Sequence, residues 1–374
     1  MSLRTAAEAQ RAGFAVLGAS VLSGVILSVA ALVILTFRIG FAPPRAGDSA
    51  SPRIAYLEYG STADALWLVD PAQPQKRRKV DSFDHGAEFG ILPSRSPDGS
   101  AFAYTALPAG TVAPNPDTPA ELWLVGFNGK DPKRLARDLD LLVRPVWAND
   151  GSALIFRRSR PQYGLFLLDL RSGRERPLAS APDAMFPIAF SAADGLLFVR
   201  LQANGSDLYR LHPADQRERL VAHLADGLTR DWALSPDGKQ LAYLSLSFAD
   251  GGVASRAFVF DITSARLRPV GDGADSEFSP VWHPDGSLSV GSLAAGAGSV
   301  TVLAADGSVR PLPGPARGFD VPVAWSAAND LLVRTFEGSS AVAPGRATVT
   351  LIDSEGRRRR VTDADVSVLG WVTP

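Results

Sequence analysis

The sequence predicts an all-β fold: a seven-bladed β-propeller with four-stranded antiparallel blades, preceded by one transmembrane helix. A strand–turn–strand unit repeats along the chain, and a charge-free apolar run lies near its beginning. The clearest copy of the unit is Trp232–Tyr243. There Pro236, Asp237 and Gly238 favour a tight reversal between two strands of alternating apolar residues.

The related turns recur at a regular spacing. They are centred on Asp98, Asp150, Asp194, Asp237, Asp285 and, with Asn in place of Asp, Asn329, so that the steps are 52, 44, 43, 48 and 44 residues. This period is typical of four-stranded propeller blades and exceeds that of most solenoids.

The blade count rests on the apolar third strand of each unit. Seven such runs occur: Leu66–Val69, Leu122–Val125, Leu165–Leu168, Leu208–Leu211, Phe258–Phe260, Val300–Val302 and Val349–Ile352. The chain ends, Arg53–Leu57 and Gly370–Pro374, each resemble half of a turn unit. The C-terminal strand is therefore expected to complete the first blade and close the ring, which removes two open sheet edges. Counts of six or eight blades are the alternatives.

The first residues divide into a tail (1–13), a transmembrane helix (14–37) and a linker (38–52) before the propeller (53–374). The run Phe14–Phe37 contains 24 residues without a charge. A helix of that length would span about 36 Å, enough for a hydrocarbon core of about 30 Å. A cleaved signal peptide has an apolar region of only about 7 to 15 residues, so the length favours a retained anchor.

Small residues form a stripe within this helix. Ser20, Gly24 and Ser28 are spaced so that a partner helix could approach closely, which would suit a subunit of a membrane assembly. The alternative interpretation is chance, since small residues are common in such helices. Arginines flank the run on both sides, at Arg11 and Arg38, so the charges do little to set the orientation.

Tryptophans recur just before the turns, at Trp147, Trp282 and Trp371, with Trp232 and Trp325 displaced by a residue or two. A ligand platform would need them in one place, whereas packing between neighbouring sheets explains their recurrence. They are assigned to the core.

The units resemble the TolB-type propeller repeat, in which an apolar residue precedes Ser-Pro-Asp-Gly and an apolar-Ala-Tyr strand follows. Trp232–Tyr243 and Ser96–Tyr104 carry the resemblance most closely, and it covers roughly Arg53–Pro374. It implies a bacterial extracytoplasmic domain that acts by binding proteins. The chain lacks the separate N-terminal α/β domain of TolB itself, and it ends where related peptidases would continue into a hydrolase domain. The expected location is the bacterial inner membrane, with the propeller on the periplasmic side.

Catalytic and cofactor motifs are absent from the sequence. It contains no Gly-x-Ser-x-Gly elbow, no His-Glu-x-x-His and no phosphate-binding loop. Cysteine is absent, and a net charge of -1 argues against nucleic-acid binding. His283 occupies a turn position, and His85, His212 and His223 stand alone in expected loops. The sequence predicts neither an enzyme nor a cofactor or metal site.

Acidic residues follow the outer strands in every unit. Because these connections share one end of a propeller, they predict an acidic channel mouth formed by Asp84, Glu88, Asp140, Asp183, Asp231, Asp275, Asp320 and Asp365. Such a mouth would attract a cation or a basic segment of a partner. The alternative interpretation is that Asp is simply a common loop residue and that Arg144, Arg230 and Arg317 interrupt the ring.

Basic runs lie on the outer strands, most densely as Lys76, Arg77, Arg78 and Lys79 in the first unit and Arg357, Arg358, Arg359 and Arg360 in the seventh. Positive charge on an edge strand deters pairing with other chains, which accounts for most of them. Because the first and seventh blades are neighbours, the two runs predict one basic patch near the membrane and its anionic headgroups.

The longest connections, Ala106–Ala120, Phe248–Ser255 and Phe336–Arg346, are expected on the same end as the acidic mouth. They are either a binding surface or idle insertions. The sequence thus predicts a non-catalytic scaffold or accessory subunit, bound to membrane proteins through its helix and to a protein partner through its loop-rich face. The alternative is a ligand- or metal-binding sensor or enzyme that uses the acidic mouth.

Overall fold

The computed structural model describes residues 52–373, except 88, 113–117, 131, 160–162, 182, 213–214, 250–251, 272–275, 295–296 and 365. These residues all belong to the second of the two units into which the chain divides, Ile39–Pro374. Every regular element among them is a β-strand. Within the described part of the chain, no helix is long and apolar enough to cross a membrane. The expected helix 14–37, with Ser20, Gly24 and Ser28, lies outside the described residues.

The strands form five four-stranded antiparallel sheets and one eight-stranded sheet. The first sheet contains β28 (Val366–Val372), β1 (Arg53–Glu58), β2 (Ala63–Asp70) and β3 (Gln73–Asp84). The eight-stranded sheet contains β4 (Leu92–Arg95), β5 (Ala101–Ala106), β6 (Ala120–Gly126), β7 (Lys133–Leu139), β8 (Val146–Trp147), β9 (Ala153–Arg158), β10 (Gly164–Asp169) and β11 (Glu175–Ala179). A single bridge, Leu139 with Arg158, joins its two halves.

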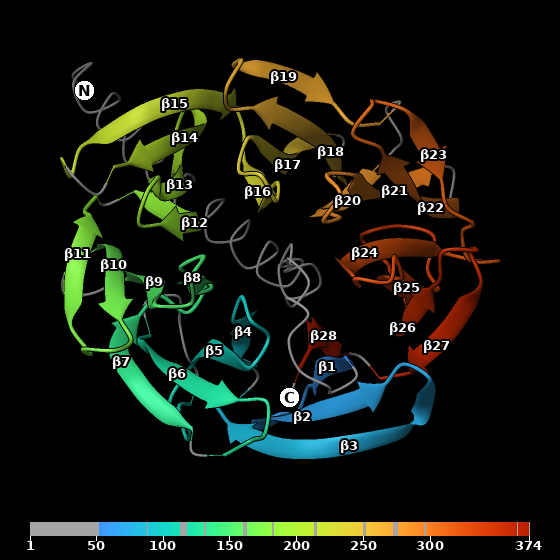
Figure 1. Ribbon diagram of the computed structural model, residues 1–374, viewed down its shortest axis with the longest axis horizontal. Coiled ribbons are helices and arrows are strands. Elements are labelled where there is room, and N and C mark those ends of the chain that lie inside the picture. The colour runs from blue at the N-terminus through green and yellow to red at the C-terminus, as the bar shows by residue number, and fades with distance from the viewer. Residues whose placement is uncertain are drawn as a thin grey trace, which may run out of the picture. The chain divides into compact units, whose positions relative to one another are not determined.

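The other four sheets follow in chain order. They are β12 (Ala184–Ser191), β13 (Gly195–Gln202), β14 (Gly205–Leu211) and β15 (Glu218–Ala225); then β16 (Thr229–Leu234), β17 (Gln240–Ala249), β18 (Gly252–Asp261) and β19 (Arg266–Pro269). The last two are β20 (Ser276–Trp282), β21 (Leu288–Ala294), β22 (Ala297–Leu303) and β23 (Val309–Pro311); and β24 (Phe319–Trp325), β25 (Leu331–Phe336), β26 (Ala347–Ile352) and β27 (Arg358–Thr362). The sheets of this unit are arranged around a circle, and the innermost strands are β4, β8, β12, β16, β20, β24 and β28 (Figure 1).

The two ends of the described chain pair with each other. The C-terminal strand β28 lies antiparallel beside β1, with Ile54 opposite Trp371 and Glu58 opposite Val366. The expected completion of the first sheet by the C-terminal strand is confirmed.

The core lies between neighbouring sheets, as the recurring tryptophans predict. The indole of Trp147 donates a 2.9 Å hydrogen bond to the carbonyl of Ser94, and that of Trp282 donates one of 2.9 Å to the carbonyl of Ala233. In both cases the acceptor belongs to the preceding group of four strands. These side chains are therefore buried connectors between sheets, and their assignment to the core is confirmed.

The Asp-Gly turns are held by their own side chains. At the turn after β16, the hydroxyl of Ser235 donates to Asp237 at 2.6 Å and accepts from the N–H of Gln240 at 2.9 Å. Gly238 has φ of 73°, a conformation that glycine adopts without strain. The hydrogen bonds from Ser235 and then Lys239 lower the pKa of Asp237, so this carboxylate is stabilised in its turn role.

The antiparallel order gives each sheet two distinct ends. The second-to-third connections and the links between sheets leave from one end, which we call the loop face; the Asp-Gly turns leave from the other, the turn face. The second-to-third connections of the loop face are residues 59–62, 107–119, 159–163, 203–204, 250–251, 295–296 and 337–346.

Candidate protein-binding face

Large apolar side chains are exposed at the tips of the loop face. Val112 is 83% exposed, Val342 74%, Phe248 51% and Tyr163 40%. These are four of the seven large apolar side chains exposed among the described residues. All four lie within or next to second-to-third connections. Their common position indicates a surface feature, because isolated exposed apolar residues would be scattered.

Phe248 is exposed because its hairpin extends past the sheet. Strands β17 and β18 pair over ten positions, from Gln240 with Asp261 to Ala249 with Gly252. The inner strand β16 pairs with β17 only as far as Thr229 with Ser245. The last residues of β17 therefore project beyond the inner strand, and Phe248 lies near the hairpin tip.

Val342 stands on a connection that is ordered by its own backbone. The N–H of Glu337 donates to the carbonyl of Arg346 at 3.0 Å, and the N–H of Gly338 donates to that of Pro344 at 2.7 Å. A further bond links the N–H of Ala343 to the hydroxyl of Ser340 at 3.1 Å. These bonds close the base of the loop and present Val342 outward.

Val112 belongs to a connection tied to its neighbour. The N–H of Gly86 donates to the carbonyl of Leu107 at 3.1 Å, and the N–H of Ala87 donates to that of Thr111 at 3.4 Å. The hydroxyl of Thr111 also donates to the carbonyl of Pro108 at 2.7 Å. The first link between sheets thus supports the start of this loop.

The predicted acidic mouth differs from the observed arrangement. Of its residues, Glu88, Asp275 and Asp365 lie outside the described part of the chain. Asp84 is exposed at the end of β3. Each of the other four lies within 4 Å of an arginine nitrogen: Asp140 by Arg157, Asp183 by Arg200, Asp231 by Arg230 and Asp320 by Arg358.

Asp140 and Asp320 are buried residues, and the side chain of Asp231 is only 6% exposed. Asp140 pairs with Arg157 at 2.6 Å and also accepts the N–H of Leu142 at 2.8 Å. Asp320 has no exposed surface and accepts two bonds from Arg358, at 2.7 and 2.8 Å. Their charges are compensated inside the protein, so these two residues do not present free carboxylates at a mouth. The partner arginines lie far enough away in the sequence that the pairing left no local signal.

Arg144, which interrupts the acidic ring in the sequence, is half-buried. Burial lowers the pKa of its guanidinium to about 10, while nearby Tyr59 and Asp231 oppose that shift. This part of the ring therefore carries compensating positive charge.

The two basic runs lie on β3 and at the start of β27, and these two strands are in contact. Half of the eight side chains have internal anionic partners. Arg77 pairs with Glu58, Arg357 with Asp353 and Glu355, Arg358 with Asp320, and Arg360 with Asp363. Lys76, Arg78, Lys79 and Arg359 are exposed, and no ion pair of theirs occurs among the described residues.

Two histidines that stand alone in the sequence have aspartate partners in space. His85 and Asp64 are both buried, with Nε2 of His85 3.2 Å from the carboxylate. His223 lies between Asp207 at 2.7 Å and Asp226 at 3.0 Å. Within the described ranges, no group of three or more histidines and carboxylates has a geometry that could hold a metal ion.

Comparison with known proteins places the chain by fold alone. No family model matches it, and no curated protein does. Among solved structures it is similar to a prolyl endopeptidase, with 15% identity and a TM-score of 0.59 over 91% of this chain and 52% of that one. It thus spans about half of that enzyme chain.

Two further solved structures are similar to this chain, and the first of them supports the same fold. The β-propeller domain of the Trilobed protease from Pyrococcus furiosus has 11% identity and a TM-score of 0.55, over 87% of this chain and 98% of that one. TolB from Acinetobacter baumannii has 14% identity and a TM-score of 0.45, over 88% and 86% of the two chains. The expected all-β propeller fold is confirmed.

Proposed function

We propose that this protein is a non-catalytic, membrane-anchored β-propeller that binds a protein partner through its loop face and serves as a scaffold or accessory subunit of a membrane complex. The observation that carries the proposal is the exposure of Val112, Tyr163, Phe248 and Val342 within or next to the second-to-third connections of four different groups of strands, all at the same end of the ring. Aromatic and aliphatic side chains of this kind contribute much of the binding energy at protein interfaces.

The framework beneath these tips supports the proposal. The connection that carries Val342 is hydrogen-bonded at its base, and Phe248 lies within the paired β17–β18 ladder, so little conformational entropy would be lost when a partner covers these side chains. A rigid ring with long loops on one end is a common way to build a specific binding surface.

We further propose seven blades for the ring. The eight-stranded sheet would count as two blades, β4–β7 and β8–β11, because one bridge alone joins them. With the five four-stranded sheets this gives the number expected from the sequence.

The anchor completes the proposed organisation. The charge-free run 14–37 would cross the bacterial inner membrane, with the propeller on the periplasmic side, and the stripe Ser20, Gly24 and Ser28 would contact a partner helix. Lys76, Arg78 and Lys79 on β3 would add contacts to anionic headgroups, at about 1 kcal/mol per residue near the surface.

The proposal is tested by extracting the full-length protein from its native membrane with a mild detergent. Native-gel separation and mass spectrometry would identify whatever comigrates with it. We expect a discrete assembly with a stoichiometric integral membrane protein. Recovery of a monomer alone after chemical crosslinking in the intact membrane would contradict the proposal.

A further inference from the structure

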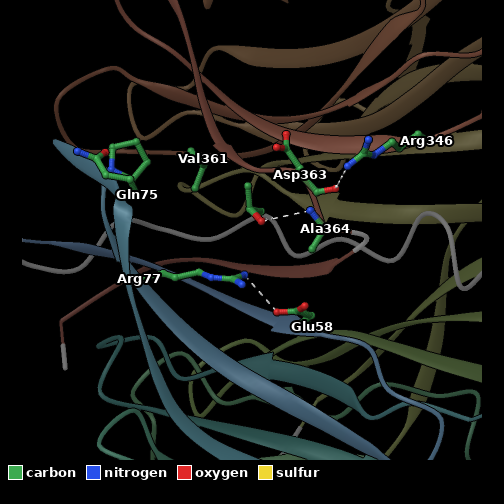
Figure 2. A pocket seen from close by; sticks show the side chains of 9 residues that line it. Glu58, Gln75, Arg77, Arg346, Val361, Asp363 and Ala364 are labelled. Atoms are coloured by element: carbon green, nitrogen blue, oxygen red, sulfur yellow. Dashed lines mark hydrogen bonds and ion pairs between the residues drawn. The ribbon is translucent and has the colours of Figure 1, made fainter.

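A cavity of about 430 Å³ lies between the first and last sheets, where the two ends of the ring meet. Glu58 and Arg77 line it from β1 and β3, and Arg346, Thr362 and Asp363 line it from the end of the β25–β26 connection and the end of β27 (Figure 2). Small-molecule sites commonly measure about 300 to 1,000 Å³. The size therefore suits a small polar ligand.

Arg77 belongs to a side-chain arrangement that occurs four times. In each, an arginine lies over an aromatic ring and pairs with a glutamate of the same group of strands; we call this an Arg–Glu stack. The four are Arg77–Trp67–Glu58, Arg134–Trp123–Glu121, Arg158–Phe166–Glu175 and Arg200–Tyr209–Glu218. Repetition indicates that the arrangement itself is structural.

The Arg–Glu stack at the cavity has the longest ion pair of the four. Its arginine–glutamate distance is 3.3 Å, against 2.9, 2.6 and 2.6 Å in the other three. The second contact of Arg77, to the hydroxyl of Tyr56, is also long at 3.4 Å. Neither partner holds Arg77 or Glu58 at the short distance of a strong ion pair, so Glu58 remains open to a competing cation.

On the opposite wall of the cavity, the positively charged Arg346 forms no ion pair with a carboxylate of the described residues. Arg346 is exposed and donates a weak 3.4 Å bond to the backbone carbonyl of Asp363. The carboxylate of Asp363 is held by Arg360 at 3.0 Å. Among the described residues, no carboxylate lies at ion-pair distance from Arg346. Figure 2 shows Arg346 across the cavity from Arg77 and Glu58.

The lining thus offers both signs of charge on facing walls. A phosphate dianion would meet the carboxylates of Glu58 and Asp363, whereas a ligand with one carboxylate and one ammonium would place its carboxylate at Arg346 and its ammonium in competition with Arg77 for Glu58. We infer that this cavity binds a short peptide with free ends, its terminal carboxylate at Arg346 and its terminal ammonium at Glu58. The cavity adjoins the loop face, since Arg346 ends the connection that carries Val342, but ligand binding there does not require the proposed scaffold role.

Triglycine is the probe, because it has both free ends and no side chains. Isothermal titration calorimetry with the full-length protein in detergent would compare triglycine with N-acetyltriglycine and triglycine amide. Each blocked form lacks one of the two proposed charges. We expect measurable binding of triglycine and at least about tenfold weaker binding of both blocked forms.

Variants then locate the site. Arg346→Ala and Glu58→Gln should each weaken triglycine binding at least about tenfold. Arg359→Ala is the matched control, since it removes an exposed arginine of β27 outside the cavity, and it should bind as the unmodified protein does. Absent binding of triglycine, equal binding of the blocked forms, or equal binding by Arg346→Ala and Arg359→Ala would each overturn the inference.

Discussion

Ion pairs within the groups of strands have two chemistries. Early in the chain, from the first sheet to β12–β15, Arg–Glu stacks cover aromatic rings at a partly solvated edge. In the last sheet, β24–β27, the corresponding contact is a buried polar track. Arg358 binds both carboxylate oxygens of Asp320 and also donates to the hydroxyl of Thr335 at 3.1 Å and to the carbonyl of Pro313 at 3.0 Å.

The two chemistries should respond differently to substitution. A partly exposed ion pair on an aromatic ring, in which the glutamate reaches solvent, loses less when broken, because water can replace the lost partner. A buried pair leaves an uncompensated charge in a low dielectric when one partner is removed. Sequence similarity among repeats therefore does not imply equal contributions to stability.

The largest effect is expected for Asp320→Ala. It leaves the Arg358 guanidinium without its two carboxylate acceptors, although that side chain keeps 22% of its surface exposed. We expect the free energy of unfolding to fall by about 3 kcal/mol, at the lower end for a broken buried pair. Urea unfolding of the full-length protein, followed by tryptophan fluorescence, measures this.

The double variant Asp320→Leu with Arg358→Leu is the control for that prediction. Replacing both charges by apolar side chains should recover most of the lost stability, because no buried charge remains. A double variant as unstable as Asp320→Ala would mean that packing, and not charge, accounts for the loss.

A smaller effect is expected for Arg200→Ala in an Arg–Glu stack. It removes a 2.6 Å pair with Glu218 and a cation over the ring of Tyr209. The two contributions together predict a loss of about 1 to 2 kcal/mol. The same unfolding assay applies, with Arg359→Ala as the exposed control. A fall in the free energy of unfolding as large as that of Asp320→Ala would contradict the difference expected between the two kinds of ion pair.

The smallest effect is a pH dependence at the buried pair beside the first sheet. Burial disfavours the charged imidazole of His85, but bonds to Asp64 and to the carbonyl of Gly86 outweigh it and raise the pKa of His85 above 6.5. Both ring nitrogens face acceptors, so the protonated form fits the site.

The pKa of His85 is higher in the folded protein than in the unfolded one. Its contribution to the stability of the fold is therefore complete below about pH 6.5, the unfolded value, and is lost as the pH rises through the folded pKa. Urea midpoints measured between pH 5.5 and 8.5 should therefore decline more steeply in the unmodified protein than in His85→Asn. Parallel pH profiles for the two proteins would contradict the assignment.

Much of the fold could be predicted from short turn motifs and from residues that recur at a fixed spacing. Asp237 and Gly238 specify their turn within four residues. Trp147 and Trp282 recur because a large side chain is packed between neighbouring sheets at the same position of each repeat. Long-range pairs leave no such pattern. Arg358 is 38 residues from Asp320, and its place within a run of four arginines concealed its inward orientation. His85 lies 21 residues from Asp64 for the same reason.

The candidate face was only partly predictable. Loop lengths indicated which connections extend from one end of the ring, but strand register determines which side chains reach the tips. Phe248 was expected at the start of the connection Phe248–Ser255, whereas it lies within β17, and the β17–β18 ladder extends it beyond β16.

The most direct measurement compares two triple variants of the full-length protein after mild extraction from the native membrane. One carries Val112→Ser, Phe248→Ser and Val342→Ser on the loop face; the other carries Leu220→Ser, Leu267→Ser and Val309→Ser on exposed positions of outer strands. We expect the partner to be lost from the first variant and kept by the second, with unfolding midpoints close to that of the unmodified protein in both. Retention of the partner by both variants, or its loss from the outer-strand variant alone, would contradict a binding role for the loop face.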